Sequence, residues 1–383
     1  MDNKKRILMY ENGSGFSFYS SHLCKALVGL YDCSIDYITT PENHYFDDIP
    51  NAKAIPILKK YSKRQKKSLL WVIDRILTSI FNCRVRNKYC KKNKHDIISI
   101  QFTTSIIDQY YLKKLHKYCS RIVLTAHDVI PPIKSFYWSK KSLKRVYETV
   151  DAIIVHSEGN KETLLKEFNI SPNKVEVINH GIDVEFNLLN QECCRNKIGL
   201  STDKIVVLFY GLIRDQKGLG ILIQSLKNIP DIQLFIAGAM PHGETFDSYE
   251  ELITSNCVDT VEHIAFVPED MTDVVFNSCD FVCLPYKYFY SQSGVFMQAI
   301  KYRKPVVVSD VSSFREFLDK YNIGFICKPN DVDDLNYAIK RMIDILKNDP
   351  HYFKKQLEKA AVENSWIIAA KKHMGVFVHD VKK

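Results

Sequence analysis

Two cations follow a strand-like run in the second half of the chain. The apolar run at 204–210 ends at a glycine, and Arg214 and Lys217 come before a helical pattern at 218–229. Backbone amides at a helix start attract anions, and Arg and Lys side chains bind phosphate oxygens. The spacing therefore predicts a binding site for a diphosphate, with a solvated turn as the alternative.

A second loop in the same half suits the same ligand. Ser293, Gly294 and Val295 stand just before a helical pattern that runs from Phe296 to Tyr302. Small side chains leave backbone amides open to a ligand, so this loop is expected to form the second half of an anion clamp. An ordinary helix cap is the alternative.

The first half of the chain carries candidates at two strand ends. Gly13 and Gly15 lie between the first apolar run and the first helical pattern, and His127 ends a later apolar run. Open α/β sheets bind ligands at the carboxyl ends of their strands, so both places are candidates. The fingerprint G-x-G-x-x-G is broken at Phe18, which argues against NAD. A tight turn and a structural histidine are the alternatives.

Basic residues concentrate in one segment. Residues 59–94 hold thirteen Lys or Arg and one acid, Asp74, which gives this segment a net charge of +12 in a chain of net charge +9. Inside it, residues 69–81 repeat apolar side chains at helical spacing. An apolar helix face flanked by cations is typical of an interfacial helix on an anionic membrane. The expected membrane residues are Lys63, Arg64, Lys66, Lys67 and Trp71.

The alternative for this segment is a helix packed on the core and flanked by solvated lysines. No nucleic acid partner is expected, because the chain lacks the motifs that bind RNA or DNA. A D-x-D pair at Asp331 and Asp333 could suggest a metal site, but it opens a helical pattern, where acids complement the helix dipole. The twelve histidines form no set with metal-ligand spacing, so no metal cofactor is expected.

Short apolar runs alternate with helical patterns along the chain. Six runs fall within residues 7–180 and six within 204–329, and the polar stretch 183–203 between them is expected to be a linker. Alternating strands and helices imply βαβ units with parallel sheets. The sequence therefore predicts an α/β protein with two doubly wound, Rossmann-like domains.

Composition and cysteine usage indicate the class of protein and its cellular compartment. The chain has 383 residues, of which 46% are hydrophobic and 25% charged, as in ordinary globular proteins. Its eleven cysteines include no C-x-x-C, which indicates a reducing compartment. No signal peptide or membrane-spanning run is evident. We therefore expect a cytoplasmic protein that is peripherally associated with the inner face of the cell membrane.

The order of these motifs resembles that of GT-B fold glycosyltransferases of glycosyltransferase family 4. In the first half the resemblance rests on the glycine loop, on His127 with Asp128, and on VHSEGNKETLL at 155–165. It spans most of the chain. In the second half the matching segments are INHGID at 178–183, YGLIRDQKGLGILIQSL at 210–226, LFIAGA at 234–239, FVPED at 266–270, DFVCLPY at 280–286 and SGVFMQAIKYRKPVVVSD at 293–310.

The resemblance implies two domains that face a central cleft. Residues 1–183, completed by a C-terminal helix at 365–383, would form the acceptor and membrane-facing domain, and residues 184–364 would bind the nucleotide sugar. Arg214 and Lys217 would stabilise the donor diphosphate in place of a metal, together with the amides near Ser293, Gly294 and Val295. His127 would contact the transferred sugar, and the Gly13–Gly15 loop would lie close to the donor phosphates.

Two glutamates of the family pattern are replaced. The family commonly carries one that contacts the donor sugar and, eight positions later, one that contacts the nucleotide ribose; here these positions are Tyr290 and Gln298. Gln298 can still hydrogen-bond hydroxyls, whereas Tyr290 cannot replace a carboxylate. The residue after the loop glycine is Leu212 where the family often has Arg, so Arg214 is expected to reach the same phosphate. Both replaced positions stay among the candidate donor-binding residues.

The sequence therefore predicts a retaining glycosyltransferase. It would move a hexose-type sugar from a UDP- or GDP-sugar to a lipid-linked or polysaccharide acceptor, in lipopolysaccharide or other surface glycan synthesis. One alternative is a sugar-nucleotide epimerase of the same fold, although the motifs hold few carboxylates for acid–base work. The other is a membrane- or polyanion-binding protein on a GT-B scaffold without transfer activity.

Overall fold

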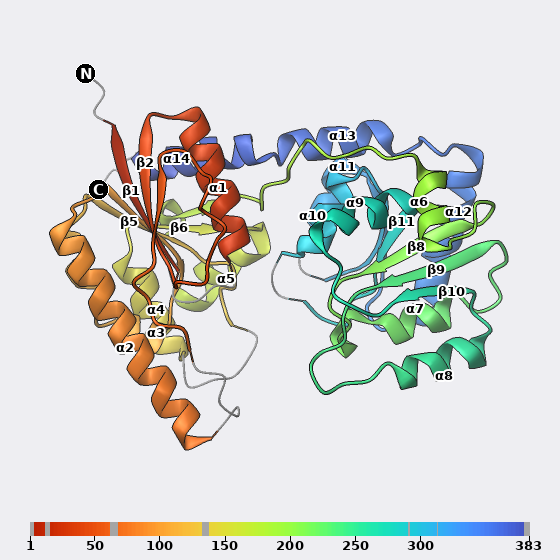
Figure 1. The fold of residues 1–383 in the computed structure, drawn as a ribbon, viewed down its shortest axis with the longest axis horizontal. Coiled ribbons are helices and arrows are strands. Elements are labelled where there is room, and N and C mark those ends of the chain that lie inside the picture. Colours follow the sequence, from red (N-terminus) through yellow and green to blue (C-terminus); the bar gives the residue numbers. More distant parts are fainter. Residues whose placement is uncertain are drawn as a thin grey trace. The chain divides into compact units, whose positions relative to one another are not determined.

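The chain forms two compact units, each built on one parallel sheet (Figure 1). The computed structural model describes residues 4–11, 16–61, 68–131, 138–289, 292–311 and 313–378. Unit 1 comprises Met1–Gly181 and Trp366–Lys383, and unit 2 comprises Ile182–Ser365. Within the described residues, no helix is both long enough and apolar enough to cross a membrane.

Unit 1 carries a seven-stranded parallel sheet in the order β3-β2-β1-β4-β5-β6-β7. The strand order reverses between β1 and β4, which is the topological switch point of the sheet. The carboxyl ends of the strands at such a point form a crevice that binds ligands. The strands are β1 (Lys5–Glu11), β2 (Cys33–Ile38), β3 (Ala52–Ile55), β4 (Ile97–Phe102), β5 (Arg121–Thr125), β6 (Ala152–Val155) and β7 (Val175–Val177). The short β3, with the sequence AKAI, is the one strand of this sheet that the sequence pattern did not predict.

Helices cover both faces of this sheet. Alternate residues of β1 point to opposite faces, so Ile7 and Met9 pack with α1 and α14, while Leu8 and Tyr10 join the core on the other face. The helices are α1 (Ser17–Leu30), α2 (Leu69–Lys92), α3 (Ser105–Asp108), α4 (Lys140–Thr149), α5 (Glu158–Phe168) and α14 (Trp366–Val378), with short 3₁₀ helices η1 (Leu112–Lys117) and η2 (Pro172–Lys174).

Unit 2 has a six-stranded parallel sheet in the order β10-β9-β8-β11-β12-β13, which is the doubly wound order of a Rossmann fold. All six strands were predicted. They are β8 (Ile205–Tyr210), β9 (Ile232–Ala237), β10 (Thr260–His263), β11 (Phe281–Leu284), β12 (Val306–Ser309) and β13 (Gly324–Cys327). The helices are η3 (Asp215–Lys217), α6 (Gln191–Ile198), α7 (Leu219–Ser225), α8 (Asp247–Asn256), α9 (Glu269–Ser278), α10 (Gly294–Lys301), α11 (Phe314–Tyr321), α12 (Val332–Asn348) and α13 (Lys354–Glu363).

Two segments of unit 2 differ from the prediction. The expected linker contains α6, which Asn190 caps at its start by accepting a hydrogen bond from the amide of Cys193, and which ends at Gly199 with φ of 85°. The helix expected at 218–229 ends at Ser225. It cannot continue because Asn228 has a positive φ of 59° and a proline follows at position 230.

Candidate functional site

The predicted phosphate loop of unit 2 turns at Gly211, directly after β8. Gly211 has a φ of 96°, and a Cβ at this position would lie 3.4 Å from a methyl carbon of Val295 and 3.5 Å from Nζ of Lys217. The loop after β8 and the start of α10 therefore meet at one point. A glycine adopts this φ at no steric cost and brings its backbone close to both side chains.

Lys217 is a half-buried cation at this point. Its Nζ lies 5.3 Å from the centre of the Tyr286 ring, and no hydrogen bond or ion pair of its ammonium group occurs within the described residues. The neighbouring carboxylate of Asp215 is instead paired with Lys287 at 2.5 Å. Burial, followed by repulsion from Arg214, lowers the pKa of Lys217 to about 8. An anion bound here would provide the negatively charged partner that this ammonium group lacks.

The start of α10 provides the second predicted half of the anion clamp. The buried Ser293 hydroxyl accepts a hydrogen bond from the amide of Phe296 at 3.4 Å and lies 3.1 Å from the Tyr286 hydroxyl. Its side chain therefore acts as the helix cap, the alternative that the sequence left open. The amides of Gly294 and Val295 lie in the first turn, where helix geometry provides them with no intrahelical partner.

Gln298 faces the same side of α10 as Val295, three residues away. Its Oε1 atom is buried and has no hydrogen-bond partner among the described residues. A buried acceptor without a donor costs free energy, which a ligand hydroxyl could recover. Tyr290, the other replaced position, lies outside the described residues.

Asp331 has the capping role that its position suggested. Its Oδ1 accepts a hydrogen bond from the amide of Asp334 at 2.9 Å, and Asp334 in turn accepts one from the amide of Lys328. The described part of the chain holds no group of three or more His, Cys, Asp or Glu side chains that could bind a metal ion.

In unit 1, Gly13 and Gly15 lie outside the described residues, but Glu11 organises the residues beside them. The buried Glu11 carboxylate accepts hydrogen bonds from the amide of Phe16 at 2.8 Å, from the Tyr37 hydroxyl at 2.6 Å and from the Ser17 hydroxyl at 3.3 Å. It thereby ties the end of β1 to the start of α1. Glu11 was not predicted from the sequence, although a carboxylate directly after the apolar run ILMY is itself a signal.

His127 lies directly after β5, as predicted, and is almost fully buried. Its ring stacks on Phe16 with the ring centres 3.9 Å apart, and the Tyr19 ring packs edge-on at 4.7 Å. Its Nδ1 atom is 3.0 Å from Nε2 of His156, which follows β6. Strands β5 and β6 pair Val123 with Ala152, so the same register carries the two histidines side by side.

The hydrogen bonds determine which nitrogen of His127 carries the proton. Nδ1 of His156 lies 2.7 Å from the Ile178 carbonyl, which can only accept, so Nδ1 carries the hydrogen and Nε2 of neutral His156 accepts. Nδ1 of His127 must then donate to it. This leaves Nε2 of His127 with a lone pair, and that atom is buried and has no partner among the described residues.

Burial keeps both histidines neutral. Burial, followed by repulsion from His156, His180 and His373, lowers the pKa of His127 well below its usual value, and burial lowers the pKa of His156 to about 4. A cavity of about 60 Å³ lies beside His127 and is also lined by Gln101 and Thr125. It has room for a few water molecules or for one small polar group of a ligand.

The aromatic residues that hold Tyr19 against His127 were also not predicted from the sequence. Tyr19 of α1 donates to Nε2 of His373 at 3.0 Å, because Nδ1 of His373 donates to the Ala369 carbonyl. The Tyr19 ring also packs against Trp366 of α14. Tyr19 and His373 are 354 positions apart in the chain, so the sequence gave no local signal for these contacts.

Most of the basic segment forms α2, which is longer than predicted. Apolar side chains are exposed in its first part, and mostly polar side chains are buried in its second part. Lys63, Arg64, Lys66 and Lys67 lie outside the described residues, and Trp71 is half-buried. Leu69 and Leu77 are 75% and 61% exposed, and Ile73 is also exposed. The buried residues are instead mostly polar: Thr78, Ser79, Asn82, Cys83, Arg86 and Cys90. Arg86 forms a buried pair with Asp108 at 2.8 Å.

Comparisons with known proteins agree with this fold. Residues 190–360 match the family Glycosyl transferases group 1, and residues 15–186 match Glycosyltransferase Family 4. The structure is similar to sucrose-phosphate synthase from Thermosynechococcus elongatus, with a TM-score of 0.76, 17% identity and coverage of 98% of each chain. It is also similar to HepE from Anabaena in complex with UDP and glucose, with a TM-score of 0.73, 15% identity and coverage of 97% and 99%.

Relatives with curated names are more similar in sequence but match only in part. A D-inositol 3-phosphate glycosyltransferase from a Mycobacterium species is 26% identical over 206 residues, 52% of this chain and 46% of that protein. An uncharacterised glycosyltransferase from Methanocaldococcus jannaschii is 30% identical over 207 residues, 51% of this chain and 52% of that protein. The chain thus spans about half the length of the curated relatives it matches.

The two parallel sheets, together with the similar solved structures, define the class, a two-domain α/β protein of the GT-B type. Because the two family matches together span nearly all of residues 15–360, the assignment is more specific. The chain belongs to the GT-B glycosyltransferases of the family 4 type.

Proposed function

We propose that the protein is a retaining glycosyltransferase that moves a hexose-type sugar from a UDP- or GDP-sugar to a lipid-linked or polysaccharide acceptor in surface glycan synthesis. The observation that carries the proposal is Lys217, a half-buried cation without an acidic partner in the described structure, whose ammonium group lies against Gly211. Negative charge grows on the diphosphate as its bond to the sugar breaks, and a fixed cation stabilises that charge.

The remaining donor contacts follow from the same loop. Arg214 provides a second cation, the amides of Gly294 and Val295 point to the phosphates, and Oε1 of Gln298 accepts a hydrogen bond from a ribose hydroxyl. The UDP complexes of HepE support a nucleotide diphosphate as the ligand class. Gly13, Gly15 and Tyr290 stay predictions from the sequence.

In unit 1, we assign His127 to the transferred sugar. Its Nε2 lone pair accepts a hydrogen bond from a sugar hydroxyl, a role for which a neutral histidine of fixed tautomer is suited. The reaction is proposed to need no divalent cation, because Arg214 and Lys217 supply the positive charge that a metal would otherwise provide.

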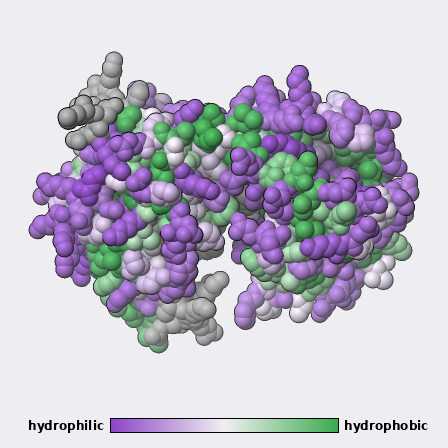
Figure 2. Space-filling model, turned by 45° about the horizontal axis from the view of Figure 1, so that its top comes forward, coloured by the Kyte–Doolittle hydropathy of each residue, from purple (hydrophilic) through white to green (hydrophobic). Residues whose placement is uncertain are grey.

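The acceptor is proposed to lie at the inner face of the cell membrane. The exposed apolar residues of α2 support this, since Leu69, Ile73 and Leu77 face outward while polar residues of the same helix are buried. Figure 2 shows hydrophobic surface at the lower left, over the end of unit 1 where α2 begins. Apolar helix faces of this kind bury themselves in the headgroup layer of a membrane.

The test is nucleotide binding followed by transfer in EDTA. Thermal shifts with UDP, GDP, ADP, TDP and their sugars identify the donor, since a ligand at 100 times its Kd adds about 2.7 kcal/mol of stability. Transfer to an acceptor should then persist in EDTA. Complete loss of transfer in EDTA, restored by Mg²⁺ or Mn²⁺, contradicts the metal-independent mechanism. Conversion of the sugar without transfer identifies an epimerase. If no nucleotide binds, the remaining alternative is a membrane- or polyanion-binding protein without transfer activity.

A further inference from the structure

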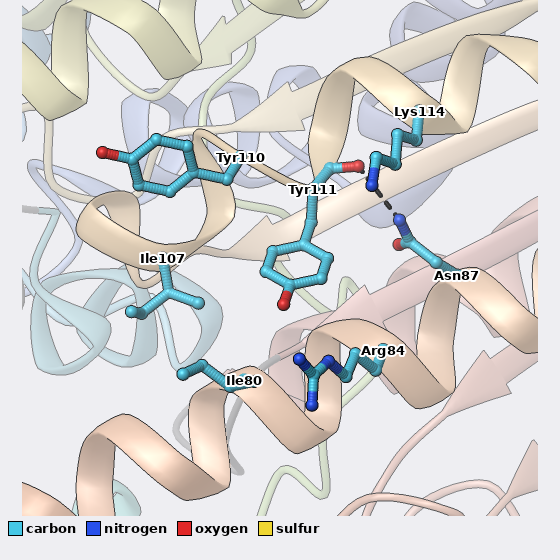
Figure 3. A pocket seen from close by; sticks show the side chains of 7 residues that line it. All are labelled: Ile80, Arg84, Asn87, Ile107, Tyr110, Tyr111 and Lys114. Atoms are coloured by element: carbon cyan, nitrogen blue, oxygen red, sulfur yellow. Dashed lines mark hydrogen bonds between the residues drawn. The ribbon is translucent and has the colours of Figure 1, made fainter.

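A second hollow lies in unit 1 and shares no lining residue with the cavity beside His127. It is an open pocket of about 630 Å³, walled on one side by α2 and on the other by the segment from α3 to η1 (Figure 3). Pockets of this volume hold small organic ligands or headgroups. The proposed transfer reaction assigns no role to it.

The two ends of the pocket differ in polarity. Figure 3 shows Ile80 and Ile107 facing each other at one end, and Arg84 and Lys114 toward the other. The Tyr111 hydroxyl points toward Arg84. The wall is held by Asn87, whose side-chain amide donates to the Tyr111 carbonyl at 3.0 Å. A ligand that fits this pocket has an apolar part and an anionic part.

Neither cation of the pocket has its charge compensated. Across the described ranges, no hydrogen bond or ion pair is formed by the side chain of Arg84 or Lys114, and both residues are exposed. Arg86, two residues further along the same helix, shows the contrast, because it is buried and paired with Asp108. Arg84 and Lys114 are therefore free to bind an anion.

The apolar end of the pocket continues the exposed stripe of α2. Ile73, Leu77, Ile80 and Arg84 follow one another at spacings of three or four residues and so share one face of the helix. At 1.5 Å per residue, Arg84 lies about 10 Å along the axis from Leu77. Interfacial helices lie in the plane of the membrane, with the apolar face at the boundary between headgroups and acyl chains. Arg84 is on the same face as the stripe and therefore lies at the level of the headgroups when the stripe enters the membrane.

We propose that this pocket binds the phosphodiester headgroup of an anionic membrane lipid. The phosphate lies between Arg84 and Lys114, the Tyr111 hydroxyl donates to it, and the acyl chains leave over Ile80 toward Leu77. The inference rests on the proposed membrane association and adds to it a specific site, which would hold unit 1 on the membrane in one orientation.

The experiment uses the full chain and short-chain lipids in monomeric form. Calorimetric titration with dihexanoylphosphatidylglycerol should show saturable binding, while dihexanoylphosphatidylcholine, whose choline opposes the two cations, should bind much more weakly. Inorganic phosphate is the third probe. If phosphate alone binds as tightly as the anionic lipid, the pocket is a site for free phosphate and the lipid assignment is overturned.

Matched variants separate this pocket from general attraction to a basic surface. Arg84→Gln with Lys114→Gln should weaken lipid binding roughly 30-fold, given about 1 kcal/mol for each cation. The control, Lys113→Gln with Lys117→Gln, removes the same charge from exposed positions of η1 outside the pocket and should change binding by less than about threefold. Equal weakening in the two variants overturns the proposal.

Two further measurements keep the test independent of folding and of the transferase proposal. Tyr111→Phe removes one hydroxyl without a charge change and should weaken lipid binding several-fold; unchanged binding would remove Tyr111 from the site. The thermal shift with UDP or GDP should be the same in all these variants. In the parent protein, absence of transfer activity with intact lipid binding would contradict the transferase alone, and absence of lipid binding with intact transfer would contradict the pocket alone.

Discussion

Lys217 combines burial, a missing acidic partner and a pKa lowered to about 8, and these features predict how ligand binding depends on pH. A diphosphate binds the protonated ammonium group, so its affinity should be constant below about pH 8. Above that value each pH unit should weaken binding by up to tenfold, because a proton must be taken up on binding. Titration of UDP or GDP between about pH 6 and 9.5 measures this slope.

The matched control for this dependence is Lys217→Arg, whose guanidinium stays charged throughout the range. Binding by this variant should be nearly independent of pH up to about pH 9.5. The same slope in the Arg variant and in the parent would mean that another group titrates.

The two loop cations should matter more for the rate than for folding. Replacing Lys217 or Arg214 by Ala removes charge that stabilises the leaving diphosphate, so kcat should fall by roughly 10²–10³. Steady-state kinetics with the identified donor measure it. Lys340→Ala, at an exposed position of α12, is the control and should leave kcat unchanged. Turnover near that of the parent in both loop variants would remove these residues from the catalytic site.

We propose that His156 is a positioning residue, since it determines the tautomer of His127 and does not line the cavity. His156→Phe leaves Nδ1 of His127 without its acceptor, and we expect kcat to fall roughly tenfold or more. The Kd of free UDP or GDP, which the loop of unit 2 is proposed to hold, should not change. His156→Gln can accept the hydrogen bond through its side-chain oxygen and should restore most of the rate; equal loss in both variants would indicate a merely structural role.

The positions of single residues could be predicted from the sequence where one element end was enough. His127 and Lys217 come after apolar runs, and the structure places them after β5 and β8; Ser293 stands before a helical pattern, and the structure places it at the start of α10. The proton arrangement at His127 could not be predicted, because it depends on a carbonyl of Ile178 beyond a third strand and on the exact register of β5 with β6.

At the scale of elements, the strands were predictable because buried parallel strands are continuously apolar. The limits of α6 and α7 were not, because they depend on capping and on positive φ angles rather than on hydrophobic periodicity. The length of α2 was underestimated for a related reason: its second half packs on the core through polar residues such as Asn82 and Arg86, which break the apolar pattern.

The close approach of Gly218 to Pro285 allows a test of how η3 is held against the end of β11. It has a φ of 76°, and a Cβ there would lie 1.9 Å from the Pro285 carbonyl oxygen. Gly218→Ala should therefore destabilise the protein by roughly 1–3 kcal/mol. Gly220→Ala is the matched control, since its Cβ would make only an ordinary contact with Leu252 at 3.5 Å.

The melting temperature of each variant, measured by calorimetry, checks this prediction. The Gly220→Ala variant should melt at the same temperature as the parent or slightly higher, because alanine favours a helix over glycine. A Gly218→Ala variant as stable as the parent would mean that the loop shifts freely, and that its shape is not fixed by this contact.

For the whole molecule, the distribution of charge matters more than its sum. The +12 of residues 59–94 exceeds the net +9 of the chain, so the remaining residues are slightly acidic. Lys and Arg near an anionic surface contribute about 1 kcal/mol each, and salt screens this attraction. Binding of the protein to anionic vesicles should therefore be strong at low salt and weaker as salt rises. Some binding should remain at high salt because apolar side chains are buried in the membrane.

The variant that tests this carries Ser in place of Lys63, Arg64, Lys66 and Lys67. It should bind vesicles of phosphatidylglycerol and phosphatidylcholine more weakly in a sedimentation assay, while transfer to a soluble acceptor analogue survives. Vesicle binding as strong as that of the parent would show that these four cations are a solvated face, and would contradict the proposed membrane contact.

The return of the chain to unit 1 after unit 2 has a consequence for biosynthesis. The core between α1 and the first sheet needs Trp366, Ala370 and Phe377 of α14, which the ribosome makes only after all of Ile182–Ser365. At about 5–20 residues per second, that delay is roughly 10–40 s. During this time unit 2 can fold while the apolar face of α1 stays uncovered, so nascent unit 1 is a client for chaperones although it is translated first.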